Sequence, residues 1–219
     1  MSVSNEFIFK KSADGKLEFV GDFDAYYQNE ADPWGQSGLE PRMQEYYKTS
    51  RARTRDLLAL ESPKSVLVVG CGAGHTMGEI QNMLPCKLVG MDISKHALVR
   101  ARELFPEFEY HVANIMSQET FAVIKERPFD VVIFEQILWY IVEPLDEALT
   151  NAASLLNSKG KLIISNAFLR DQKYGMEYIN GYPGAAARFS THRSFRLVHS
   201  SYQDDGLLHT DGHFVLEKK

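Results

Sequence analysis

Cysteine and long apolar runs are both scarce in this sequence. Cys71 and Cys86 are the two cysteines in 219 residues, too few for a disulfide framework, so a reducing compartment is expected. No apolar run is long enough to span a bilayer, and the first residues lack the apolar core of a secretion signal. These absences favour a cytoplasmic protein without a membrane partner.

Basic side chains are outnumbered by acidic ones. The chain has 24 Lys and Arg residues against 29 Asp and Glu residues, a net charge of -5, which argues against nucleic acid as its main partner. Among its seven histidines, His209 and His213 have a spacing that metal ligands use on helices. They flank the turn signal Asp211-Gly212, however, so we expect no metal site.

The apolar content is sufficient for one sizeable core. Hydrophobic residues make up 44% of the chain, as in ordinary soluble domains. Alternating strand and helix signals begin near residue 62. We therefore expect an N-terminal extension of hairpin, lid and helix over residues 1–61, followed by a single domain over residues 62–219.

The most informative stretch is residues 64–74. The uninterrupted apolar residues 66–69 predict a strand buried on both faces of a parallel sheet. Gly70, Gly72 and Gly74 follow, and such glycines allow a sharp turn and let a ligand lie against bare backbone. A helix over residues 75–84 would point its first amides at that ligand. The unit predicts a nucleotide-type cofactor, although a plain strand-to-helix turn would show the same glycines.

Spacing narrows the type of cofactor. A dinucleotide fold requires G-x-G-x-x-G, whereas here His75 occupies the place of the third glycine and the pattern is G-x-G-x-G. Residues 88–92 predict a second strand that ends in Asp92, at about the distance from Gly70 at which such folds place a ribose-binding acid. Taken alone, Asp92 is equally well explained as a helix N-cap.

Strand and helix signals then alternate, which predicts an α/β fold. Further strands are expected at residues 108–112, 129–134 and 162–165, and helices at residues 94–105, 121–127 and 144–156. Residues 168–192 are expected to form an insert with a short helix over the substrate pocket. Residues 195–202 and 213–218 are expected to pair as an antiparallel hairpin.

Candidate catalytic residues follow the strand at residues 129–134. In open α/β sheets, ligands bind outside the carboxyl ends of the strands, so Glu135 and Gln136 should lie beside the reactive part of the cofactor. Tyr140, one helical turn further on, should edge the same pocket. We take Glu135 and Tyr140 as the catalytic candidates, with a helix cap and core packing as their respective structural alternatives.

The glycine triplet and the acid that ends the second strand together resemble the class I S-adenosylmethionine-dependent methyltransferases, over residues 62–219. The resemblance implies a Rossmann-like sheet with an antiparallel last strand and helices on both faces, S-adenosyl-L-methionine as cofactor and a small-molecule methyl acceptor. It places Asn114 at the adenine amino group, where many members have aspartate, and Ile115 against the ring. The residues expected at the cofactor are Trp34, Tyr47, Gly70, Cys71, Gly72, Asp92, Ile93, Asn114, Ile115, Glu135 and Gln136.

The N-terminal extension is rich in aromatic residues. Residues 7–20 alternate around Asp14-Gly15, which predicts a hairpin packed on the domain or on a partner chain and leaves a homodimer open. Asp32-Pro33-Trp34 predicts either a hydrophobic latch or a lid whose flat rings suit an adenine or a sulfonium. Residues 40–60 predict a helix whose arginines form a solvated face or supply one ligand for the cofactor carboxylate.

A second resemblance concerns the acceptor. Residues 23–27 and 32–34 are similar to the N-terminal lid of the nodulation protein S family of N-methyltransferases, as are the run Glu135-x-x-Leu138-x-Tyr140 and Gly184-Ala185. Those enzymes methylate the free amine of a deacetylated chitin oligosaccharide. The resemblance implies that Trp34 and Tyr47 help enclose the cofactor and that the acceptor is a small-molecule amine, such as an amino sugar.

Residues 135–138 also bear on other classes of methyltransferase. Nucleic-acid amino-methyltransferases show Asp- or Asn-Pro-Pro-aromatic where this chain has residues 135–138, and a magnesium-dependent O-methyltransferase needs more acidic ligands than Glu135 alone. A small-molecule O-methyltransferase is an alternative, but it would need a base such as histidine, which the sequence does not place at the pocket. The alternative of a different class is a non-catalytic module that binds the cofactor or a partner through this fold.

Overall fold

The computed structural model describes residues 6–37, 41–124, 128–204, 206 and 209–219. The strands are β1 (Phe9–Lys11), β2 (Leu17–Phe19), β3 (Ser65–Val69), β4 (Lys87–Asp92), β5 (Glu109–Val112), β6 (Phe129–Glu135), β7 (Leu156–Leu169), β8 (Phe195–Gln203) and β9 (His209–Lys218). The helices are α1 (Phe23–Asn29), α2 (Pro41–Glu61), α3 (His75–Gln81), α4 (Lys95–Leu104), α5 (Leu145–Leu155) and α6 (Gly181–Ser190), with short 3-10 helices η2 (Gln118–Val123) and η3 (Leu138–Tyr140).

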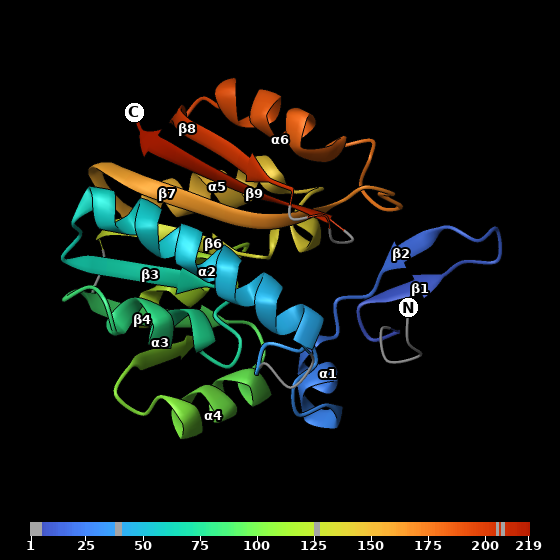
Figure 1. The fold of residues 1–219 in the computed structure, drawn as a ribbon, viewed down its shortest axis with the longest axis horizontal. Helices are drawn as coiled ribbons and strands as arrows, with labels where there is room; N and C mark the ends of the chain where they lie inside the picture. The colour runs from blue at the N-terminus through green and yellow to red at the C-terminus, as the bar shows by residue number, and fades with distance from the viewer. Residues whose placement is uncertain (1–5, 38–40, 125–127, 205, 207–208) are drawn as a thin grey trace.

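A seven-stranded sheet organises the molecule, in the order β5-β4-β3-β6-β7-β9-β8 (Figure 1). The pairs from β5 to β7 are parallel, whereas β9 runs antiparallel to both β7 and β8. The predicted Rossmann-like sheet with an antiparallel last strand is therefore confirmed, and the N-terminal hairpin forms its own small sheet of β1 and β2.

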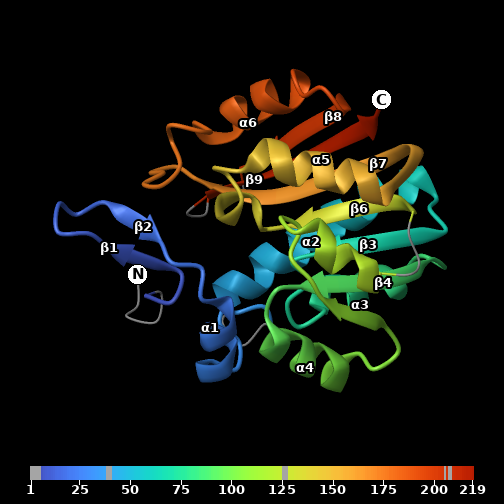
Figure 2. The ribbon, with the colours of Figure 1, turned by 180° about the vertical axis from the view of Figure 1, so that it is seen from behind.

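Two apolar cores cover the two faces of this sheet. Alternate residues of β3 point to opposite sides, so Val66 and Val68 pack with Leu58 of α2, and Leu67 and Val69 join the other cluster. The first face also receives α3 and α4, and the second receives α5 and α6. Figure 2 shows α5 in front of the sheet, with α2 behind it. Burial on both faces of the sheet explains why the apolar residues of β3 follow one another without interruption.

The N-terminal hairpin forms as predicted, but its turn differs. Phe9 pairs with Phe19 and Lys11 with Leu17, so five residues, 12–16, form the loop instead of the two-residue Asp-Gly turn. Gly15 alone takes a positive φ, while the Asp14 carboxylate accepts hydrogen bonds from the Ser12 hydroxyl and the Lys16 amide. An aspartate that closes the loop through its side chain thus replaces the tight turn.

Several elements differ in length from the sequence expectation. β7 extends well beyond residues 162–165 because β9 pairs with it from Lys161↔Glu217 to Leu169↔His209. The helix expected at residues 121–127 is instead the 3-10 helix η2 over Gln118–Val123, and residues 125–127 lie outside the described part of the chain. In that described part, no helix has both the length and the apolar character needed to cross a membrane.

The packing beneath the glycine loop gives a stability prediction. A Cβ added at Gly90 of β4 would lie 2.7 Å from Tyr110 Cδ1 and 2.9 Å from both Cys71 Sγ and Met77 Sδ. We expect Gly90→Ala to lower the free energy of unfolding by about 1–3 kcal/mol through overpacking. Gly184→Ala in α6 is the control, because its Cβ would meet no atom closer than 3.5 Å and alanine favours the helix. Urea unfolding checks both, and equal stability of the two variants would contradict the prediction.

Candidate active site

A cavity of about 580 Å³ lies at the carboxyl edge of the parallel strands. Its floor comes from the ends of β3, β4 and β6 and from the segment after β5. The hairpin, α1, the segment around Trp34 and α2 supply the remaining walls. Residues distant in the sequence therefore meet where the fold predicts a ligand.

The first glycine of the loop is required by its surroundings. Gly70 has φ +71, and a Cβ there would lie 2.2 Å from Ile137 Cγ2. Any side chain would therefore strain the backbone and collide with the segment after β6. Gly70 lines the cavity, whereas Cys71 and Gly72 are absent from its described lining, although both were expected at the cofactor.

Asp92 lies level with this loop at the end of β4. Its Oδ2 accepts a hydrogen bond of 2.9 Å from the Gly72 amide, and its Oδ1 accepts one of 2.9 Å from the Ser94 amide. The N-cap of α4 is Ser94, whose hydroxyl accepts from the Ala97 amide. Burial raises the pKa of Asp92, opposed by these backbone hydrogen bonds. Asp92 is therefore tied to the glycine loop and does not cap the helix.

The structure brings most of the predicted site residues together. Asn114 and Ile115 follow β5 along the same edge, and the Asn114 Oδ1 accepts a hydrogen bond from the Met116 amide. The predicted site residues that line the cavity are Trp34, Tyr47, Gly70, Asp92, Ile93, Asn114, Ile115, Glu135, Gln136 and Tyr140.

Glu135 is the deepest charged group of the cavity. Glu135 is only 6% exposed. Its Oε2 has no hydrogen-bond partner in the described part of the chain. Burial raises the pKa of Glu135 to about 7, although Arg51 and a Thr76 hydrogen bond lower it. A carboxyl with an unpartnered oxygen thus lies at the cavity wall, where its negative charge is costly without a cation.

Arg51 of α2 is the cation whose charge lowers the pKa of Glu135. Its guanidinium carbon lies 5.0 Å from the centre of the Tyr47 ring. Its Nε and Nη2 are buried and have no hydrogen-bond partner among the residues that the structure describes. Burial lowers the pKa of Arg51 and raises that of Tyr47 to about 12. The predicted solvated arginine face is therefore wrong, since Arg53 pairs with Asp211 and Arg55 with Glu79.

Tyr140 stands in a cluster of rings contributed by separate segments. Its ring lies 4.9 Å from Phe23, 5.9 Å from Trp34 and 6.0 Å from Phe19, measured between centroids. Phe19 in turn lies 6.4 Å from Tyr174 of the insert. Burial raises the pKa of Tyr140, so its phenol stays neutral. These rings form an apolar wall on the hairpin side of the cavity.

The insert contributes less than expected. Tyr174 lines the cavity, but in the described lining no residue of α6 appears, because this helix packs on β7, β8 and β9. Sequence reasoning also did not assign Tyr46, Phe19, Glu143 or Tyr174 to the site. The aromatic density of the extension was the available signal, but it did not distinguish wall residues from core residues.

Comparison with known proteins agrees with this geometry. Residues 67–162 match the model of a methyltransferase domain family. No curated protein matches the sequence. The site therefore lies in a stretch that is similar to a methyltransferase domain, and S-adenosylmethionine is the cofactor that such a domain implies.

Solved structures show the same fold in enzymes of different names. The N-methyltransferase NodS from Bradyrhizobium japonicum WM9, in complex with S-adenosyl-L-homocysteine, has a TM-score of 0.69 at 14% identity and covers 89% of this chain and 97% of its own. The magnesium protoporphyrin IX methyltransferase ChlM from Synechocystis PCC 6803, with bound SAM, has a TM-score of 0.64 at 16% identity and covers 90% and 93%. The CurJ carbon methyltransferase has a TM-score of 0.66 at 14% identity and covers 91% and 62%.

Glu135 predicts a dependence of stability on pH. A carboxyl whose pKa is higher in the folded than in the unfolded state stabilises fully below the unfolded value of 4.5, and that stabilisation is lost as the pH rises through about 7. Relative to Glu135→Gln, the wild type should lose about 2–3 kcal/mol of unfolding free energy between pH 5 and pH 8. Urea unfolding of both proteins at several pH values measures this, and a constant difference would refute the raised pKa.

Proposed function

We propose that this protein is an S-adenosylmethionine-dependent methyltransferase whose acceptor is a small-molecule amine. The single observation that supports an amine is the charge of the cavity. Among the described residues that line it, the charged ones are Asp92, Glu135 and Glu143, all acidic, and none is a lysine, arginine or histidine. Such a lining favours cationic molecules and disfavours phosphorylated ones.

The residues present fit the proposed cofactor. Asp92, at the edge beside Gly70, is positioned to accept from the ribose hydroxyls, and Asn114 and Ile115 are positioned for adenine. The carboxyl of Glu135, whose Oε2 has no partner among the described residues, would balance the positive end of the cofactor. Trp34 and Tyr47 would enclose it from the lid and from α2.

The residues chiefly position the reactants. When bound, S-adenosylmethionine supplies a methyl carbon that the amine lone pair attacks as the carbon–sulfur bond breaks and its electron pair passes to sulfur. Holding two reactants in line is worth roughly 7–11 kcal/mol of barrier in well-oriented systems. The carboxylate of Glu135 can hold the proton that the ammonium must lose, because burial brings its pKa to about 7.

The same residues argue against a hydroxyl acceptor. An alcohol needs a base within hydrogen-bond reach during attack, most often a histidine. His75, which follows the glycine loop, is absent from the described cavity lining, and burial lowers its pKa. In the described residues no group of three or more His, Cys, Asp or Glu side chains is arranged to hold a metal ion.

The ribose assignment is tested at Asp92. Asp92→Ala should weaken S-adenosylmethionine binding at least about 100-fold, because two hydrogen bonds to a carboxylate are lost. Isothermal titration calorimetry measures this. The control is Asp146→Ala, which removes an exposed carboxylate paired with Arg188. Unchanged affinity in Asp92→Ala would exclude the ribose contact.

The acceptor class is tested with a panel of amines, alcohols, carboxylates and phosphorylated amines, scored by S-adenosylhomocysteine release. We expect turnover of amines, amino sugars among them, with kcat/KM rising with pH as the ammonium deprotonates. A phosphorylated analogue should be at least about tenfold poorer, equivalent to about 1.4 kcal/mol. Turnover confined to alcohols would reject the amine, and an absence of turnover with intact cofactor binding would favour a binding module.

A further inference from the structure

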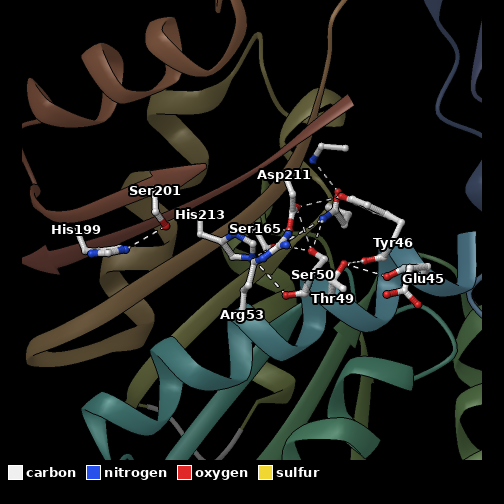
Figure 3. A network of polar contacts seen from close by, with 12 residues as sticks. Glu45, Tyr46, Thr49, Ser50, Arg53, Ser165, His199, Ser201, Asp211 and His213 are labelled. Atoms are coloured by element: carbon white, nitrogen blue, oxygen red, sulfur yellow. Dashed lines mark hydrogen bonds and ion pairs between the residues drawn. The ribbon is translucent and has the colours of Figure 1, made fainter. Parts of the chain in front are cut away.

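Polar side chains between α2 and the antiparallel part of the sheet bind one another. Figure 3 shows side chains of α2 directed at side chains of β7 and β9. Asp211 is 1% exposed, and its Oδ1 accepts hydrogen bonds from the Tyr46 hydroxyl at 3.2 Å and from the Ser50 hydroxyl at 3.1 Å. Its Oδ2 accepts one of 3.0 Å from Arg53 Nη1. This carboxylate is therefore compensated within the protein and ties α2 to the sheet.

Gln136 extends this network to the wall of the cavity. Its Nε2 donates hydrogen bonds to the Ser165 hydroxyl at 3.2 Å and to the Ser50 hydroxyl at 3.4 Å. Its Oε1 accepts one of 2.8 Å from the Ala167 amide. Both hydrogens of the Gln136 side-chain amide are thus used. Gln136 and Tyr46 both line the cavity, but their donors are already bonded inside the protein.

The hairpin side of the cavity is lined by aromatic rings. Phe19 of β2, Phe23 of α1, Tyr140 of η3 and Tyr174 of the insert belong to this lining, and we call these four residues the ring wall. The Phe19 and Tyr140 rings are nearly parallel, at 15° with centroids 6.0 Å apart. Phe23 stands edge-on to Tyr140, with centroids 4.9 Å apart. Aromatic rings favour such offset and edge-on contacts, so the ring wall suits one further ring.

Phe19 has apolar surface that the described part of the chain leaves exposed. Phe19 is 38% exposed, whereas the other three residues of the ring wall are partly buried. The next residue, Val20, is 39% exposed and also lines the cavity. The hairpin that carries them is nevertheless docked, because Ile8 is fully buried and the Phe9 ring lies 4.9 Å from the Tyr174 ring. Apolar surface that a docked element leaves exposed at a cavity is typical of a ligand site.

We infer that the ring wall binds an aromatic ring of the acceptor, which makes the acceptor an arylalkylamine and Phe19 a residue that determines specificity. The inference rests on the proposed function and deepens it to one class of amine. The ammonium group is attracted to the acidic side chains Asp92 and Glu135 at the ends of β4 and β6, while the ring covers Phe19. An amino sugar is less suited, because its hydroxyl groups would lie against rings that offer no hydrogen bonds.

The test uses phenylalkylamines and their cyclohexyl counterparts. The probes are benzylamine, phenylethylamine and phenylpropylamine, each paired with the amine in which cyclohexyl replaces phenyl, and kcat/KM is measured by S-adenosylhomocysteine release. We call the kcat/KM of the phenyl compound divided by that of its cyclohexyl counterpart the phenyl ratio. For the pair that the wild type turns over best, Phe19→Leu should lower the phenyl ratio at least about threefold, equivalent to about 0.65 kcal/mol. The wild type should also use the best phenylalkylamine at least about tenfold more efficiently than glucosamine.

Phe9→Leu is the matched control. Phe9 is the cross-strand partner of Phe19, and its ring lies 5.6 Å from the Phe19 ring, but it is absent from the described lining of the cavity. This variant should keep the phenyl ratio within about 1.5-fold of the wild type. Phe19→Tyr, which retains a ring, should keep it too. Circular dichroism checks folding, with Phe19→Ile as the substitute if Phe19→Leu does not fold, and the affinity of Phe19→Leu for S-adenosylhomocysteine should match the wild type.

The possible failures are distinguishable. If amines are turned over but Phe19→Leu keeps the phenyl ratio, or glucosamine is the better acceptor, the inference is overturned and the proposed function stands. If no amine is turned over, both are overturned. An equal fall of the phenyl ratio in Phe9→Leu would overturn the inference, because the effect would then come from hairpin docking. A comparable loss of S-adenosylhomocysteine affinity in Phe19→Leu would overturn it as well, because the ring wall would then hold the cofactor.

Discussion

Parallel pairing of β3 with both of its neighbours is the constraint on which the site depends. Val69 is level with Met91 of β4 and with Phe134 of β6, so the next residue of each strand lies at the same edge. Those next residues are Gly70, Asp92 and Glu135. A slip of one residue in either register would turn the acid to the opposite face of the sheet. The two apolar cores prevent such a slip, because it would exchange their buried side chains.

Charge balance inside the cavity is a second constraint, and it links stability to binding. Among the described residues, the buried Glu135 Oε2 and the buried Arg51 Nε and Nη2 atoms have no hydrogen-bond partner, so each is held at a cost in folding free energy. Groups of this kind persist where a ligand completes their hydrogen bonds, and the positive end of the proposed cofactor would do so for Glu135.

Local sequence patterns were sufficient to predict the central sheet and its glycine loop. They were insufficient to predict the contacts of the elements around that sheet. The apolar run at residues 66–69, the glycines and the alternation of elements predicted the sheet and its carboxyl edge, because periodicity and turn chemistry are local signals. The length of β7 and the partners of α2 depend on β9, which is the last strand of the chain. They are therefore set by residues far away in the sequence. The contact between Tyr46 and Asp211 joins residues that are 165 positions apart, so no spacing rule could reveal it. The arginines of α2 were misread for the same reason, since their partners lie on other elements.

Methyltransferases that are named for different reactions share this fold. An N-methyltransferase, a magnesium protoporphyrin IX methyltransferase and a carbon methyltransferase share this fold at 14–16% identity, so the fold alone does not determine the acceptor. In this chain, segments outside the seven-stranded sheet meet at the cavity. The hairpin brings Phe19 against Tyr140, the insert brings Tyr174, and α2 brings Tyr46. The proposed amine would meet an apolar aromatic wall on one side of the cavity and acidic side chains on the other, which suits an amine attached to a flat or apolar group.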